Sequence, residues 1–395
     1  MIGFDEAAAL IEAAATPLGR ETVALAEAGG RVLAAPVVAG LDSPASDTSA
    51  MDGYAVRAVE VAELPVRLRI IGESFAGRGF DGRMGPGECV RIFTGAPMPA
   101  GADRVIIQEI VRRDGDEALF GHALGGGRHV RAMGSDFRAG DTLLQPGRRL
   151  DARAMVAAAA ADRATVEVWR RPRVVVLGTG DELAEPGSAA GTPGSIPESV
   201  SFGVAALIAQ YGGEVIGRRR LKDDPASLEA AAAAALDEAD LVVVTGGASV
   251  GEKDYARAMF GPAGLALIID KVAIKPGKPV WLGRARDRLV LGLPGNPTSA
   301  MVTGRLFLGP LVAGLSGAKA GSALDWRPAR LGAALGACGD RETFHRAAWR
   351  HGRAHPLTDQ DSSAQKALAA ADLLIRRRPG EPDAAAGDEV ETLDF

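Results

Sequence analysis

The sequence contains very few cysteines and few aromatic residues. Cys89 and Cys338 are the only cysteines in 395 residues. Two thiols so far apart provide neither a disulfide framework nor a zinc site. Aromatic residues make up 5% of the chain, yet the hydrophobic fraction is 47%, which is enough to build cores. Folding therefore has to rely on packing of apolar side chains.

The chain also has no long block of like charge and no long apolar run. Its formal net charge is -5 and its sequence pI is about 5.7, values that argue against a dedicated nucleic-acid binder. The first residues, Met1–Glu6, do not resemble a signal peptide, and no stretch approaches the roughly 18 apolar residues of a membrane span. We expect a cytoplasmic protein that binds neither nucleic acid nor membrane.

Length and pattern indicate several domains, because 395 residues exceed one ordinary domain. A helix is predicted at 4–16, and short alternating runs between turns indicate an inserted β unit at 46–138. A helix at 150–161 and a strand at 166–169 follow it, so the module around the β unit is built from both flanks. Residues 321–395 indicate a further small β module.

From residue 173 onward apolar strands alternate with helices. We predict strands at 173–177, 214–218, 241–244, 268–274 and 289–293, and helices at 201–210 and 225–238. This alternation is typical of a doubly wound parallel sheet covered on both faces. Such sheets bind ligands at the carboxyl ends of their strands. The glycine-rich turns, the paired lysines and several carboxylates of this sequence all follow predicted strands.

Two glycine-rich turns begin like nucleotide-binding motifs and then depart from them. The turn 178–183 has Leu183 where a dinucleotide fingerprint needs glycine, and the turn 246–251 is followed by Glu252 where a P-loop has lysine. Neither nicotinamide nor ATP binding is favoured. The second turn is either a backbone cradle for an anion, or a tight turn without a ligand. Its candidate binding residues are Gly246, Gly247, Ser249 and Gly251.

Positive charge and a helix start follow two later strands. Lys275 and Lys278 lie on a turn stiffened by two prolines, which suits phosphate or an oxyanion, although surface lysines are commonly only solvated. Pro294 begins a turn in which Asn296 can cap the next helix, and Ser299 lies in its first turn. This second turn is either an anion site or a helix cap without further function.

Carboxylates stand beside these turns. Asp181 and Glu182 follow the first strand, Asp223 follows the second, and Asp254 follows the glycine-rich turn. Coordination of Mg²⁺ between carboxylate and phosphate oxygens is a common reason for acids beside anion-binding turns. Asp224, directly before Pro225, is instead placed to cap a helix. The five histidines show no metal-ligand spacing.

Two further candidates lie in the β unit. Asp52 and Thr94 occupy glycine-containing turns, where such residues commonly serve the turn alone. Spacing along the chain cannot bring them near residues 181–299.

Eight phrases in order resemble the molybdopterin molybdenumtransferases, the bacterial MoeA and gephyrin E-domain family. They are SAMDGYAV (49–56), RIFTGAPMP (91–99), GSDFRAGD (134–141), VVVLGTGDEL (174–183), KDDP (222–225), VVVTGGASVGEKDY (242–255), IKPGKP (274–279) and GLPGNPTSA (292–300). Their order and spacing cover residues 1 to about 320, with a weaker match beyond.

The resemblance implies a multidomain α/β and β fold. It comprises an elongated helical/β linker domain (1–45 and 139–171), an inserted β domain (46–138), a molybdopterin-binding α/β domain (172–320) and a C-terminal β-barrel-like domain (321–395). It also implies a homodimer with an active site shared between subunits, in which Asp52 and Thr94 face the partner's α/β domain.

The resemblance implies insertion of molybdate into adenylated molybdopterin with release of AMP, assisted by Mg²⁺. The pterin and phosphate would lie along Gly180, Asp181 and the turn 246–251, and molybdate near the paired lysines and the turn 294–299. The implied catalytic residues are Asp52, Thr94, Asp136, Glu182, Asp223 and Asp254, with Glu182 and Asp254 as the Mg²⁺ ligands. A molybdopterin adenylyltransferase is an implied partner.

Two segments depart from the family pattern. Residues 197–201 read Pro-Glu-Ser-Val-Ser where the family has an aromatic residue followed by Asp/Asn-Ser-Asn, and residues 359–363 lack the usual glycine. The first departure would reshape one wall of the pterin pocket. A paralogue that binds pterin or a partner protein without turnover, or that prefers another metal or nucleotide, therefore stands beside the transferase. An unrelated sugar or nucleotide phosphotransferase is a third reading.

Overall fold

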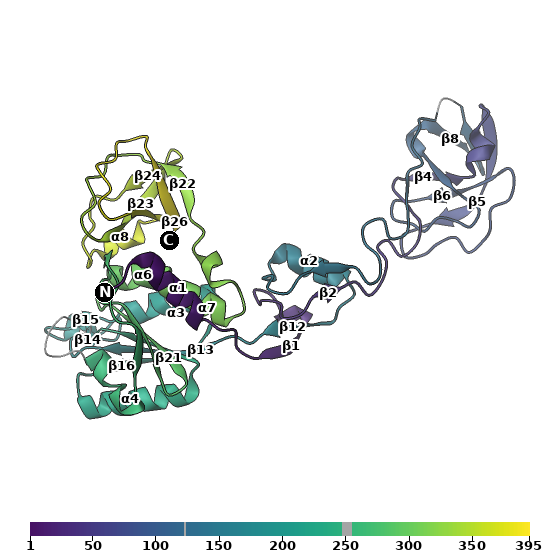
Figure 1. Cartoon of the computed structure of the whole chain (residues 1–395). Coiled ribbons are helices and arrows are strands. Elements are labelled where there is room, and N and C mark those ends of the chain that lie inside the picture. Colours follow the sequence, from purple (N-terminus) through teal and green to yellow (C-terminus); the bar gives the residue numbers. More distant parts are fainter. Residues whose placement is uncertain (122–123, 247–254) are drawn as a thin grey trace.

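The computed structural model describes residues 1–121, 124–246 and 255–395. The chain is elongated, and one lobe stands far from the rest of the molecule at the end of a narrow connecting region (Figure 1). This distal lobe is a six-stranded sheet, in the order β7 (Arg104–Ile107), β4 (Gly53–Val56), β6 (Glu88–Ile92), β5 (Val66–Ser74), β9 (Glu117–Phe120), β8 (Val111–Asp114).

The central sheet has the order β16 (Glu214–Leu221), β13 (Arg173–Thr179), β17 (Leu241–Thr245), β21 (Arg288–Leu293), β20 (Trp281–Ala285), β18 (Ala266–Ile269). The first four strands are mutually parallel, as the alternation of strands and helices predicted. β20 runs antiparallel to both of its neighbours, so the sheet is mixed and not wholly parallel.

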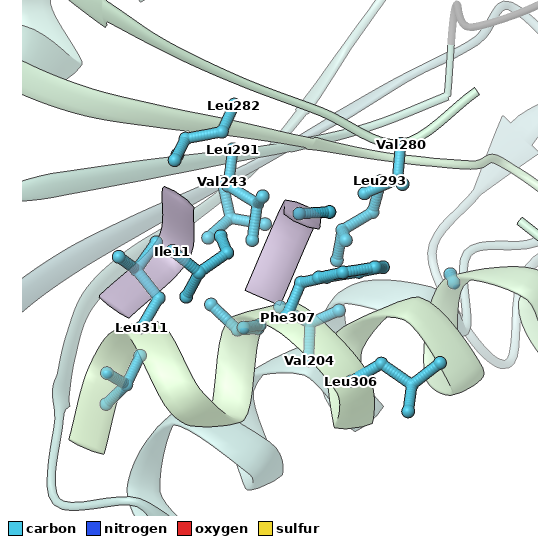
Figure 2. Close-up of a cluster of buried hydrophobic side chains, with 14 of the residues drawn as sticks. Ile11, Val204, Val243, Val280, Leu282, Leu291, Leu293, Leu306, Phe307 and Leu311 are labelled. Atoms are coloured by element: carbon cyan, nitrogen blue, oxygen red, sulfur yellow. The ribbon is translucent and has the colours of Figure 1, made fainter. Parts of the chain in front are cut away.

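Helices cover both faces of the central sheet. One face packs against α1 (Phe4–Ala14), α3 (Val200–Gln210), α6 (Pro297–Thr303) and α7 (Gly309–Leu315). The other packs against α4 (Pro225–Glu238) and α5 (Tyr255–Ala258). Figure 2 shows Val243, Leu291 and Leu293 of the sheet directed toward Phe307 and Leu311 of the helical layer. Two cores that share one apolar sheet fix the strand ends in space.

Local signals explain several boundaries. α4 begins where Asp224 accepts a hydrogen bond from the Ser227 backbone N–H at 2.9 Å, with Pro225 as the first helical residue, as predicted. The strand predicted at 268–274 is wrong as one element. It divides into β18 and a short β19 (Ile274–Lys275), which pairs with a different sheet.

The connecting region consists of short two-stranded ribbons and one helix. β1 (Arg20–Ala24) pairs with β12 (Thr165–Trp169), β2 (Val37–Val38) with β11 (Thr142–Leu144), and β3 (Thr48–Ser49) with β10 (Val130–Arg131). The helix α2 (Ala152–Ala160) packs beside them. Each ribbon joins a strand from before the distal lobe to one from after it, so chain segments from both flanks build this region.

The C-terminal sheet has the order β19, β23 (Glu342–Arg350), β25 (Leu373–Arg377), β26 (Glu389–Asp394), β22 (Arg327–Arg330), with β24 (Arg353–Pro356) paired to β23. The short helix α8 (Gln365–Ala369) precedes β25. Buried Arg376 ties this sheet to the N-terminal helix, because it bonds both Glu342 and Asp5 and lies 4.8 Å from the Phe4 ring centroid. The C-terminal sheet is thereby fixed against the central one.

Among the described residues, one helical stretch, Pro297–Leu315, is long and apolar enough to cross a membrane by length and composition alone. It joins α6 and α7 through a π-helical turn at Gly304–Leu308. Of its apolar window, 94% is buried inside the protein. It is therefore a core helix of the central layer. Its mean hydropathy of 1.2 is higher than we expected, because the sequence analysis predicted no apolar stretch near the length of a membrane span.

Candidate functional site

The carboxyl ends of three neighbouring parallel strands meet at one edge of the central sheet. β13 ends at Thr179, and the next turn begins with Gly246 after β17. Gly246 has φ +92°, and a Cβ atom there would lie 2.4 Å from the Thr179 carbonyl oxygen, so no other residue fits. A Cβ on Gly295, after β21, would lie 3.2 Å from the Gly246 Cα. The glycines therefore let three strand ends meet closely.

A cavity of about 610 Å³ opens at this edge. This volume lies within the range of about 300–1,000 Å³ that is usual for small-molecule sites. Its lining residues come from the strand ends, from the segment 182–200 and from the C-terminal part of the chain: Thr179, Gly180, Glu182, Leu183, Ile196, Pro197, Glu198, Ser199, Val200, Asp223, Thr245, Gly246, Pro279, Pro294, Gly295, Asn296, Pro297, Ser363 and Gln365.

The cavity brings together six of the residues predicted for the site, namely Gly180, Glu182, Asp223, Gly246, Pro294 and Asn296. Asp181 is not in the lining, but its Oδ1 accepts a hydrogen bond from the Asp223 backbone N–H at 3.2 Å. The two acidic turns after β13 and β16 are thereby held to each other.

The Glu182 carboxylate lies directly over the turn at Gly180. A Cβ atom on Gly180 would lie 2.7 and 2.9 Å from its two oxygens, and the φ of Gly180 is +150°. A larger residue at this position would displace the carboxylate. Gly180 therefore leaves room for the Glu182 carboxylate in this position, and its turn also lines the cavity.

Other predicted residues lie elsewhere or outside the described part of the chain. Lys275 and Lys278 are exposed and are not in the lining, and Ser299 is buried in α6. Gly247, Ser249, Gly251 and Asp254 lie outside the described residues.

The predicted helix cap at Asn296 is not formed by its side chain. Asn296 does occupy the N-cap position of α6, but its Nδ2 donates to Ser362 Oγ at 2.9 Å. The Thr298 backbone N–H also donates to the Ser362 carbonyl, at 3.1 Å. A loop from the C-terminal sheet therefore takes part in capping this helix, which a local sequence pattern cannot reveal.

That loop is anchored by a buried arginine. Arg346 of β23 is 1% exposed, and its guanidinium donates to the carbonyl oxygens of Asp361 and Asp359, both at 3.0 Å. The anchored loop carries Ser363 and leads to Gln365, both of which line the cavity. Ser363 ends the departing segment 359–363, but neither it nor Gln365 was predicted as a site residue, because their contact with the site depends on the docking of a separate sheet.

Thr179 and Thr245 were also not identified. Each is the polar last residue of an otherwise apolar buried strand, and each is less than 5% exposed. A hydroxyl at the carboxyl end of such a strand was the available signal. The Thr179 hydroxyl donates to the Thr245 carbonyl at 3.4 Å.

The distal lobe carries a second cluster of predicted residues. Asp52 Oδ1 accepts hydrogen bonds from the Thr94 backbone N–H at 2.7 Å and from the Thr94 hydroxyl at 2.8 Å. These bonds, the backbone one first, lower the pKa of Asp52 below its usual range, and nearby Arg91 adds to the effect. Asp136 is exposed in the chain that returns from this lobe. The structure thus joins Asp52 to Thr94 but keeps both far from the cavity within one chain (Figure 1).

Comparison with known proteins decides the family. Residues 2–161 match the model described as MoeA N-terminal region (domain I and II), 175–314 match the probable molybdopterin binding domain, and 328–395 match the MoeA C-terminal region (domain IV). A molybdopterin molybdenumtransferase of Nostoc sp. is 38% identical over 335 residues, which cover 82% of this chain and 76% of the relative. The chain belongs to the molybdopterin molybdenumtransferase family.

Further members support the assignment. The molybdopterin molybdenumtransferase of Haemophilus influenzae is 37% identical over 81% of this chain and 79% of its own length. A crystal structure of a molybdopterin biosynthesis MoeA protein from Pyrococcus horikoshii covers 100% of both chains, with a TM-score of 0.85 and 26% identity. The multidomain α/β and β fold predicted from the sequence is therefore confirmed over the whole chain.

The donor set of the cavity suits a magnesium ion that is shared with a ligand. Glu182 and Asp223 supply carboxylate oxygens, which are the ligands Mg²⁺ prefers, and Mg²⁺ is commonly held by one or two carboxylates plus substrate phosphates. No group of three or more His, Cys, Asp or Glu side chains with metal-binding geometry occurs in the described residues. Of the two metal ligands that the resemblance implies, Glu182 lines the cavity and Asp254 lies outside the described residues.

Proposed function

We propose that this protein transfers molybdenum from molybdate to adenylated molybdopterin with release of AMP. The observation that carries the proposal is the cavity at the carboxyl edge of the sheet, where Glu182 and Asp223 stand beside the Gly180 and Gly246 turns. It combines oxygen ligands for a divalent cation with backbone that an anionic ligand can approach closely. The relatives named above carry this activity in their names.

In this proposal the chain's own residues bind and orient the adenylated substrate. The glycine turns admit the phosphate region, and Glu182 and Asp223 hold Mg²⁺, which when bound neutralises phosphate charge and polarises the phosphoanhydride. The exposed ammonium groups of Lys275 and Lys278 supply positive charge for molybdate. Asp254, Gly247, Ser249 and Gly251 keep the roles that the family resemblance implies.

The proposal includes a homodimer whose active site is shared. Asp52 and Thr94 form a preorganised pair on the distal lobe, yet their own chain's cavity lies far away (Figure 1). A second subunit would place this pair opposite the cavity, and Asp136 keeps the role that the family resemblance implies. The proposal further includes a cytoplasmic location and supply of the adenylated pterin by a molybdopterin adenylyltransferase.

Molybdate-dependent release of AMP tests the proposal. Purified protein with Mg²⁺ and adenylated molybdopterin should release AMP when molybdate is added, and Glu182→Gln should lower the rate at least ~100-fold, because a neutral amide binds Mg²⁺ poorly. Glu185→Gln, an exposed neighbour outside the cavity lining, is the matched control and should keep the wild-type rate. Absence of any molybdate-dependent AMP release would contradict the proposal.

One observation favours a second candidate, a relative that binds pterin without turnover. The departing residues Pro197, Glu198, Ser199 and Val200 all line the cavity. Tight pterin binding without molybdate-dependent AMP release would favour this candidate over the enzyme.

A further inference from the structure

One carboxylate in the cavity wall is buried, in contrast to the exposed Glu182. Glu198 lines the cavity but is only 7% exposed. Its Oε1 accepts the Ser201 backbone N–H at 2.8 Å, and its Oε2 accepts the Ser201 hydroxyl at 2.5 Å. Each carboxylate oxygen can accept two hydrogen bonds, so each retains one acceptor position for a ligand. Ser201 thus orients the Glu198 side chain but leaves part of the hydrogen-bonding capacity of its carboxylate unused.

Arg218 supports the contact between Ser201 and Glu198. Arg218 of the edge strand β16 donates from Nη1 to Ser201 Oγ at 3.1 Å. Its guanidinium carbon also lies 3.6 Å from the centroid of the Phe202 ring. A guanidinium stacked on an aromatic ring has little freedom, so the sequence of contacts from Arg218 through Ser201 to Glu198 is preorganised.

A hydroxyl group lies on the same side of β13 as the buried carboxylate. A methyl group placed on Gly178 would lie 3.6 Å from Thr245 Oγ1 and 3.7 Å from Glu198 Cγ, so both side chains flank the same point above β13. Thr245 is 3% exposed and also lines the cavity. Glu198 and Thr245 therefore both belong to the cavity wall near this point.

We propose that Glu198 and Thr245 recognise the 2-amino-4-oxo edge of the pterin ring, an inference that rests on the function proposed above. This edge carries an amino group and a ring N–H side by side, followed by a carbonyl. The carboxylate accepts from both nitrogens, and the Thr245 hydroxyl donates to the carbonyl. A site built to hydrogen-bond specific ligand groups discriminates strongly against a ligand that lacks them, because buried polar groups would then stay unpaired.

Two small ring compounds test the assignment directly. Pterin carries the 2-amino group, whereas lumazine has a second carbonyl there and keeps the 4-carbonyl. Wild-type protein should bind pterin at least ~10-fold more tightly than lumazine in calorimetric titrations, since a carbonyl facing a carboxylate cannot be hydrogen-bonded. An equal affinity for the two compounds would overturn the inference without any variant.

Two variants separate the roles of the side chains. Glu198→Gln can still accept from Ser201 but presents an amide to the ligand, so the preference for pterin should disappear. Thr245→Val removes a donor to the carbonyl that both compounds share, so both affinities should fall by the same factor, about 3- to 10-fold. A Glu198→Gln protein that keeps the wild-type preference would refute the assignment.

The outcome can be told apart from failure of the proposed function. Should wild-type protein release AMP on addition of molybdate while Glu198→Gln retains the pterin preference, only the assignment of Glu198 falls. Should wild-type protein bind neither ring compound and release no AMP, both proposals fall together.

Discussion

At the scale of single residues, the site depends on carboxylates whose surroundings differ. Asp52 is held by two donors from one residue, Thr94, which lower its pKa. Glu198 is buried and hydrogen-bonded to Ser201, whereas Glu182 is exposed and lies over Gly180. The roles proposed for these acids therefore rest on environment more than on residue type.

The hydroxyl of Thr94 supports a prediction about pH. Thr94→Val removes one of the two bonds to Asp52, so the pKa of Asp52 should rise toward its usual value. Because the folded-state pKa is depressed, wild-type Asp52 stays ionised as the pH falls, and the variant should lose the ionised form at a higher pH. The acid limb of the rate of AMP release should shift upward in pH.

Thr22→Val, on the exposed β1, is the control and should leave that limb in place. An unchanged acid limb in Thr94→Val would show that ionisation of Asp52 does not limit the reaction.

Single residues were the hardest level to predict from the sequence. Asp52 and Thr94 were each singled out from a motif, but the hydrogen bonds between them are visible only in the structure. The contribution of Ser363 and Gln365 depends on Arg346, which holds their loop from another sheet. Asn296 occupies its predicted N-cap position, yet its side chain donates a hydrogen bond to Ser362 in the loop from the C-terminal sheet. Local patterns carry no information about such contacts.

At the scale of elements, the glycine turns set how closely the strand ends approach. Apolar runs and helix signals predicted β13, β17, β21 and α4 within a few residues, because burial and capping are local in sequence. The reversed strand β20 was not predicted, since an apolar run does not encode its direction. The division between β18 and β19 was also missed, because β19 pairs with β23 of the C-terminal sheet, a contact that depends on how the domains pack.

Replacing the glycine at the closest approach should therefore destabilise the protein. Gly246→Ala would combine a positive φ with a Cβ atom 2.4 Å from the Thr179 carbonyl oxygen. We expect the free energy of unfolding in urea to fall by at least ~2 kcal/mol. Gly264→Ala is the matched control, because Gly264 has φ +72° but nothing within 4 Å of an added Cβ.

The control isolates the cost of backbone strain, which should be about 1 kcal/mol. Equal losses in the two variants would mean that the strand ends can separate, and the tight junction between them would then have no energetic role.

At the scale of the whole molecule, the elongated shape divides the predicted catalytic residues between two lobes. The Asp52–Thr94 pair lies on the distal sheet, and Glu182 and Asp223 lie at the cavity (Figure 1). The connecting region is made of paired strands from both flanks, which hold the lobes apart. Under the proposed function, two chains are therefore needed to complete one site.

Mixed dimers measure this claim most directly. Asp52→Ala and Glu182→Gln subunits, each inactive alone, should regain about a quarter of wild-type AMP release when mixed in equal amounts, because half of the dimers would be mixed and each would contain one intact site. If both residues served the same chain's site, every chain would carry one defect. A mixture that shows no recovery, although mixed dimers form, would contradict the account.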